Sequence, residues 1–149
     1  MAILRDEDRE VIRKELEQGL AAEVTLTLVG PSALAPPARD LTPQIREIYE
    51  ELAALSPKVK LEWVEVPTAA QRDALGMAPG DGGPLTVVSA PGAKGKVRYL
   101  GAPAGHEFPN LLRALVDVSR GESGLSERSR AAVAKIAQPT HIRVFFTPT

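Results

Sequence analysis

The strongest constraint on the fold is a pair of strand patterns that flank a helical pattern. Residues 24–29 (VTLTLV) and 59–66 (VKLEWVEV) alternate between apolar and polar side chains, as strands do. Between them, apolar residues recur at helical spacing over residues 45–55, after Thr42 and Pro43, which suit the N-cap and the first helical position. A strand–helix–strand unit with a right-handed crossover places its two strands side by side and parallel. We therefore expect a βαβ unit at the centre of the fold.

A charged helical segment precedes this unit. We expect Asp6 or Asp8 to cap it at its N-terminus and Gly19 to end it. The apolar residues expected on its buried side are Val11, Ile12, Leu16 and Leu20.

The segments after the βαβ unit add an antiparallel hairpin. A short helix over residues 69–75 leads to strands at 84–89 and 96–100, which a Gly-containing turn joins. A further amphipathic helix starts near Phe108. The pattern predicts an α/β fold, with a mixed four-stranded sheet and helices on both faces, which is the thioredoxin-like arrangement. We also expect an additional C-terminal helix, and a strand over residues 141–146.

Composition excludes several classes of function. The net charge of −1 over 149 residues gives no electrostatic footprint for nucleic acid or for an anionic membrane. No apolar run approaches the ~20 residues of a membrane span, and the charged N-terminus argues against a signal peptide, so we expect a cytoplasmic protein. The absence of cysteine removes disulfides, thiolate metal sites and thiol catalysis. Abundant proline and a single asparagine favour a heat-adapted source.

Two segments carry a resemblance to a known family: VRYLGAPAGHEF at residues 97–108 and VDVSRGE at 116–122. The chain resembles the protein disulfide oxidoreductases, glutaredoxin-like proteins built from two tandem thioredoxin-fold units. This resemblance implies that residues 1–122 form one unit, and that residues 123–149 are a linker helix and the first strand of a second unit. A thin internal repeat agrees with it, since an offset of 117 residues superposes LTLVGPS on RVFFTPT.

The resemblance also locates a lost redox motif. It places the Cys-x-x-Cys of the family over Arg39, Asp40, Leu41 and Thr42, none of which carries a thiol. The flavoprotein component of alkyl hydroperoxide reductase likewise has a first thioredoxin-like unit without redox cysteines. A threonine hydroxyl is too weak an acid to replace a thiol without a dedicated base. We therefore expect no catalytic residue, no cofactor and no metal site in these residues.

Gly83 and Pro84 match the position of the cis-proline loop of thioredoxin folds, where a bound peptide can pair with the backbone. The alternative is that Pro84 only begins an edge strand and fixes a turn. His106 has two interpretations, an acid–base or metal-binding group and a cap for the helix that follows, of which we favour the cap.

Three functions remain open at this point. The leading hypothesis is a redox-inactive domain that acts together with a second thioredoxin-like unit or with a redox partner protein. Its role would be to support that partner, to dock substrates or to form a dimer. The second is a glutathione-dependent transferase in which Ser32 would activate the thiol of glutathione. The third is a pure dimerisation module that forms a homodimer.

Overall fold

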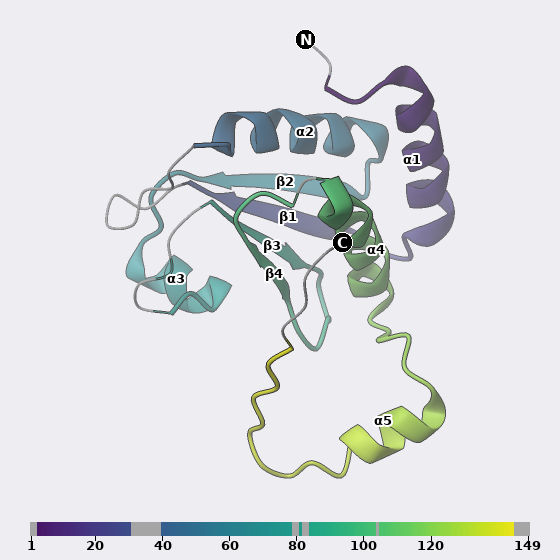
Figure 1. The fold of residues 1–149 in the computed structure, drawn as a ribbon, viewed down its shortest axis with the longest axis vertical. Coiled ribbons are helices and arrows are strands. Elements are labelled where there is room, and N and C mark those ends of the chain that lie inside the picture. The colour runs from purple at the N-terminus through teal and green to yellow at the C-terminus, as the bar shows by residue number, and fades with distance from the viewer. Residues whose placement is uncertain (1–2, 31–39, 79–80, 82–83, 104, 145–149) are drawn as a thin grey trace.

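The computed structural model describes residues 3–30, 40–78, 81, 84–103 and 105–144. Its centre is a four-stranded sheet of order β2-β1-β3-β4, made of β1 (Val24–Val29), β2 (Val59–Val64), β3 (Leu85–Ser89) and β4 (Val97–Leu100) (Figure 1). β1 and β2 are parallel, with Val24 opposite Val59, whereas β3 is antiparallel to both β1 and β4. This confirms the predicted mixed sheet and its βαβ unit.

Helices cover both faces of the sheet. Three of them, α1 (Asp6–Gly19), α2 (Thr42–Leu55) and α4 (Phe108–Arg120), share one apolar cluster with the sheet. The fully buried side chains at its centre include Leu16, Leu26, Leu52 and Leu115. The short α3 (Ala69–Leu75) lies beside a smaller cluster on the other face, formed by Val29, Leu85 and Val87 with Leu75 and Met77 packed against it. The large core therefore lies on the α2 side.

The N-terminus of α1 differs from the prediction. Its N-cap is Arg5, which makes no side-chain cap, so the expected caps Asp6 and Asp8 are wrong. The Arg5 Nε atom instead donates to Asp8 Oδ2 at 2.8 Å. The acidic first turn still suits the positive end of the helix dipole. Val11, expected on the buried side, is 65% exposed.

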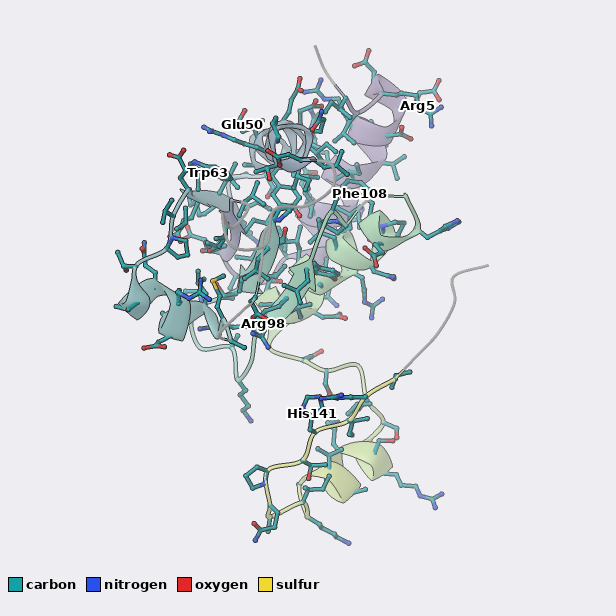
Figure 2. The ribbon with its side chains drawn as sticks, turned by 60° about the vertical axis from the view of Figure 1, so that its left-hand side comes forward. Arg5, Glu50, Trp63, Arg98, Phe108 and His141 are labelled. Carbon is teal, nitrogen blue, oxygen red and sulfur yellow. The ribbon has the colours of Figure 1, made fainter. Side chains whose placement is uncertain are left out.

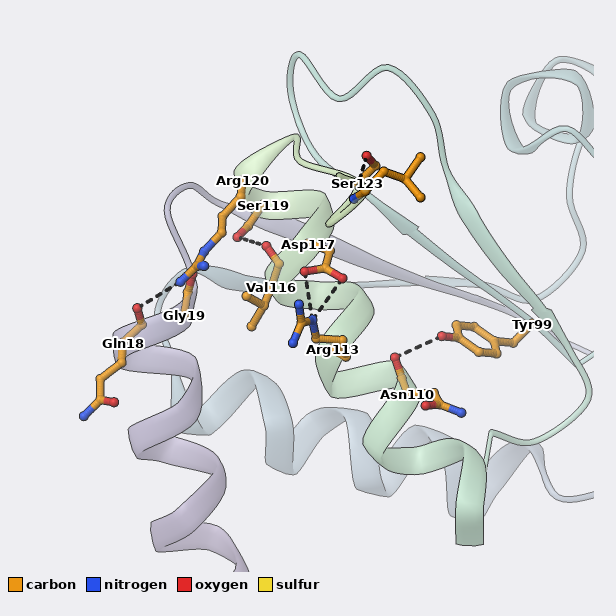
Figure 3. Close-up of polar contacts among 11 residues, drawn as sticks. Gln18, Gly19, Tyr99, Asn110, Arg113, Val116, Asp117, Ser119, Arg120 and Ser123 are labelled. Carbon is orange, nitrogen blue, oxygen red and sulfur yellow. Dashed lines mark hydrogen bonds and ion pairs between the residues drawn. The ribbon is translucent and has the colours of Figure 1, made fainter. Parts of the chain in front are cut away.

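The C-terminus of α1 is held by α4. Arg120 Nε of α4 donates to the carbonyl oxygen of Gly19 at 2.8 Å (Figure 3). The neighbouring Ser119 Oγ bonds within α4, where it donates to the carbonyl oxygen of Val116 at 2.7 Å. The Arg120 guanidinium therefore satisfies a carbonyl at the end of α1 that has no partner within its own helix. α4 itself ends at Gly121, whose φ of 65° is left-handed.

The described part of the C-terminal segment, up to residue 144, has no core of its own. α5 (Glu127–Val133) is capped by Ser126, whose hydroxyl accepts the Ser129 N–H at 3.2 Å, and the helix contains no buried residue. It lies apart from the sheet in Figure 1. Residues 141–144 are not a strand, so the predicted strand is wrong for this part, and Phe145 and Phe146 lie outside the described residues. A strand needs a hydrogen-bonded neighbour, and the sheet of the described residues ends at β2 and β4.

Among the described residues, no helix is both long enough and apolar enough to cross a membrane.

Candidate functional site

The start of α2 is where the resemblance seen in the sequence predicts the lost redox motif, and this assignment stays a prediction. Leu41, with φ of −99° and ψ of 3°, is the N-cap residue, and its carbonyl oxygen accepts the Ile45 N–H at 3.0 Å. Asp40 Oδ1 accepts the Thr42 N–H at 2.9 Å. Thr42 is therefore the first helical residue, and the prediction that it is the N-cap is wrong. Arg39 lies outside the described residues.

Asp40 is the charged group at this helix end. Thr42 lowers the pKa of the Asp40 carboxyl, through its side chain and through its backbone N–H. The positive end of the helix dipole favours a carboxylate at this position as well. An anion thus already occupies the place where a helix N-terminus would otherwise stabilise a thiolate.

The hydroxyl of Thr42 is buried against the body of the protein. The residue is only 4% exposed. Its Oγ1 lacks a hydrogen bond of ordinary geometry in the described part of the chain. The neighbouring Asp40 carboxylate is a weak base, because its pKa is lowered, so it does not activate the hydroxyl as a nucleophile.

A hollow of about 680 Å³ opens beside this helix start, between α2 and the end of β2. It is lined by Asp40, Thr42, Pro43, Arg46, Glu47, Glu50, Trp63 and Glu65. The guanidinium carbon of Arg46 lies 5.3 Å from the centre of the Trp63 ring, and Arg46 Nε donates to Glu50 Oε1 at 2.9 Å. Figure 2 labels Glu50 on α2 and Trp63 on β2 at this side of the molecule. The wall of the hollow is thus one aromatic ring, one cation and several carboxylates.

Sequence reasoning missed this hollow. Trp63 is half-buried, packs partly on the core and also contacts Arg46. A signal was present in the i, i+4 spacing of Arg46 and Glu50, which places both on one side of α2. The proximity of Arg46 and Glu50 to Trp63 depends on the βαβ crossover, which packs α2 beside β2.

The second predicted site lies on the other side of β1. Pro84 is buried just before β3, and its carbonyl oxygen accepts the Gly101 N–H at 2.8 Å. Gly83 lies outside the described residues, as does Ser32, the residue of the transferase alternative. Peptide docking at Gly83 and Pro84 stays a prediction.

His106 lies in an exposed turn of 3₁₀-helix, Gly105–Glu107, ahead of α4. The N-cap of α4 is Glu107, which makes no side-chain cap, so the cap predicted for this segment is not formed. Within the described ranges, no three histidine or acidic side chains gather as a metal site would require.

A buried polar pair joins α2 to the sheet beneath the site. Tyr49 Oη and Thr86 Oγ1 are 2.8 Å apart, and both residues are buried. Burial raises the pKa of Tyr49, so the phenol stays neutral. This bond links α2 to β3, and the packing of the core keeps Tyr49 away from solvent.

No protein-family model matches the sequence, and no curated protein matches it. Solved structures do. A protein disulfide oxidoreductase from Aeropyrum pernix K1 matches with a TM-score of 0.66 at 18% identity, over 89% of this chain and 55% of the other. The alkylhydroperoxide reductase protein AhpF from Enterococcus faecalis V583 matches with a TM-score of 0.68 at 19% identity, over 91% of this chain and 61% of the other. The isolated NTD_N/C domain of AhpF gives a TM-score of 0.67 at 19% identity, over 87% of this chain and 59% of the other.

This chain therefore spans only 55% to 61% of the structures that it matches. The match confirms the predicted architecture. The chain has a thioredoxin-like fold, similar to the thioredoxin-like domains of protein disulfide oxidoreductase and of AhpF, and it contains no cysteine.

Proposed function

We propose that this chain is a redox-inactive thioredoxin-like unit that supports a second thioredoxin-like unit, and that the second unit carries out dithiol–disulfide exchange. The observation that carries the proposal is the chemistry at the start of α2, where Asp40 accepts the Thr42 N–H, Thr42 is buried, and the sequence supplies no thiol. Dithiol exchange requires a thiolate as the attacking group, and this chain has none to supply.

The length of the structural matches supports a partner unit. The matching proteins extend well beyond the region that this chain covers. A thioredoxin-like unit without cysteines can still contribute a docking surface, or hold a neighbour in position.

The C-terminal segment, defined here as residues 123–144, supports docking through packing. Its exposed apolar side chains are Leu125, Val133, Ile136, Ile142 and Val144. A seven-residue helix such as α5 is only marginally stable in water without tertiary contacts. Burial of these side chains against a partner unit would supply those contacts.

An insulin-reduction assay tests the redox part of the proposal. With dithiothreitol as electron donor, we expect the chain to reduce insulin no faster than the buffer blank. A cysteine-containing thioredoxin at equal concentration serves as the positive control. Turnover that rises with the concentration of the chain would contradict the proposal.

Sedimentation velocity at several protein concentrations tests the nature of the partner. A monomer at all concentrations agrees with a heterologous second unit. A dimer that forms as the concentration rises would favour the homodimer and the pure dimerisation module. Replacement of Val133 and Ile136 by Asp then shows whether the C-terminal segment forms that dimer.

A further inference from the structure

We infer that the outer edge of β2 is a dimerisation surface for a second copy of this chain. The two β2 strands lie antiparallel, in a register that places Lys60 of each copy opposite Glu62 of the other. β2 forms the edge of the sheet that lies away from α5 (Figure 1). The inference goes beyond the proposed function, because a dimer formed at β2 leaves the C-terminal segment free to pack on a second unit.

The outer side of β2 offers backbone groups for strand pairing. Within the described sheet, β2 pairs only with β1. The carbonyl oxygens of Lys58 and Val64 point to the β1 side, where they accept N–H groups at 2.8 and 2.9 Å. Successive residues of a strand alternate, so Val59, Leu61 and Trp63 turn their backbone groups outward. The Val59 N–H already donates within the preceding turn at 3.1 Å, and the other outward groups can pair with an added strand.

The two edges of the sheet differ in how they are protected. Natural proteins protect exposed edges with short strands, prolines and charges, lysine above all. β4 has only four residues, whereas β2 has six and contains no proline. The lysine of β2 is Lys60, so a strand that adds to this edge must compensate the charge of Lys60.

β2 itself carries the compensating charge. Glu62 lies two residues after Lys60, and both side chains are exposed. A two-fold axis at Leu61 sets each Lys60 opposite Glu62 of the other copy, which gives two ion pairs. These residues form non-hydrogen-bonded pairs in this register, where side chains approach most closely.

The contacts that these two side chains make within the chain are compatible with this pairing. Lys60 Nζ lies 3.6 Å from Glu23 Oε2, and both side chains are about half exposed. Glu62 Oε2 accepts the Thr27 hydroxyl at 3.3 Å, and its second carboxylate oxygen can accept a bond from the other copy.

The opposite face of β2 favours the same register. Leu61 lies on the axis and meets its own copy, and Trp63 meets Val59 of the other copy. Leu61 and Trp63 are half-buried and pack partly on the core. An aromatic ring opposite a β-branched side chain is one of the favourable cross-strand pairs.

The neighbouring registers bring like charges together. The backbone pattern and the buried face allow only registers in which a residue meets one of the same face. One step in one direction places Lys60 opposite Lys60 of the other copy, and one step in the other direction places Glu62 opposite Glu62. Like charges directly opposite each other destabilise a strand pair, so the charges of β2 select a single register.

Exchange of the two charges tests the surface by sedimentation velocity. We expect the unchanged chain to form a dimer as its concentration rises. Lys60→Glu or Glu62→Lys should each raise the dissociation constant about ten-fold, because two attractive contacts become repulsive. An equimolar mixture of the two variants should dimerise again, since glutamates then face lysines. Glu17→Lys, which changes an exposed charge on α1, is the control and should dimerise as the unchanged chain does.

The register has a test of its own, because the chain contains no cysteine. Leu61→Cys should cross-link two copies under mild oxidation, since directly opposite Cα atoms lie about 5.5 Å apart, within the range of a disulfide. Val64→Cys is the matched control on the same strand. Its sulfur would lie opposite Lys58 of the other copy and should cross-link far more slowly.

Four results would overturn the inference. They are a monomer at every concentration, a dimer that Lys60→Glu leaves unchanged, a mixture of the charge variants that stays monomeric, and equal cross-linking of the two cysteine variants. A dimer that is lost when Val133 and Ile136 are replaced by Asp would overturn it too, because that dimer would form through the C-terminal segment. The redox part of the proposed function fails separately, by insulin reduction.

Discussion

At the scale of single residues, two buried threonines hold the same hydroxyl in opposite surroundings. Thr86 is fully buried on β3, and its Oγ1 lies 2.8 Å from Tyr49 Oη. Thr42 is 4% exposed, and its Oγ1 has no hydrogen bond of ordinary geometry in the described chain. A hydrogen-bonded buried hydroxyl stabilises the fold, whereas an unpaired one costs its full desolvation.

Valine should therefore cost much less stability at position 42 than at position 86. Thr42→Val removes a hydroxyl that has no hydrogen bond of ordinary geometry but still lowers the pKa of Asp40, so we expect the free energy of unfolding to change by less than about 0.5 kcal/mol. Thr86→Val should cost about 1–3 kcal/mol, because it leaves the Tyr49 phenol unpaired in the core. Urea denaturation of the two variants measures both values. A comparable loss of stability in Thr42→Val would show that its hydroxyl is hydrogen-bonded in solution.

At the scale of elements, helix α1 ends at Gly19, which packs against Val116 of α4. A Cβ atom built on Gly19 would lie 2.6 Å from Val116 Cγ2. Val116 is buried, and its branched side chain has few alternative rotamers within a helix. The glycine is thus required by the contact between two helices, and not by a left-handed turn.

Gly19→Ala tests this contact. Alanine favours a helix over glycine by about 1 kcal/mol, but overpacking costs typically about 1–3 kcal/mol. We expect a net loss of about 1 kcal/mol in the free energy of unfolding, measured by urea denaturation. In a Val116→Ala background the clash is absent, so the same substitution should be neutral or stabilising there. Equal effects of Gly19→Ala in the two backgrounds would contradict the contact.

The elements also show what a sequence can predict. Periodicity reports which side of a segment is buried, so the strands and helices were predicted, with α3 correct at both ends. Helix ends depend on backbone geometry that periodicity does not report. For this reason Leu41 rather than Thr42 caps α2, and Arg5 rather than Asp6 or Asp8 caps α1.

The candidate site, like the helices, was predictable from the sequence only in part. The absence of cysteine is visible in the sequence itself, because it concerns which residues are present. The hollow at the start of α2 is not visible, because it requires Trp63 of β2 to meet Arg46 of α2 across the βαβ crossover. That contact depends on the register and the rotamers of two separate elements.

At the scale of the whole molecule, the chain divides into a packed body and an exposed C-terminal segment. The body holds every buried residue of the described chain, from Ile12 to Ser119. Beyond Arg120, all described residues are exposed except Ser129, which is half-buried. The buried core that stabilises the fold therefore consists of residues before the predicted boundary at residue 122.

Removal of residues 123–149 should accordingly leave the body intact. We expect the free energy of unfolding of the shortened chain to agree with that of the full chain within about 0.5 kcal/mol, since exposed residues contribute little. Urea denaturation of both proteins measures the difference, and hydrogen exchange of the full chain should show amides of α5 that exchange far faster than those of β1 and β3. A loss of several kcal/mol on truncation, or slow exchange in α5, would mean that the C-terminal segment packs on the body. The exposed Val133 and Ile136 would then no longer be free to dock a partner unit.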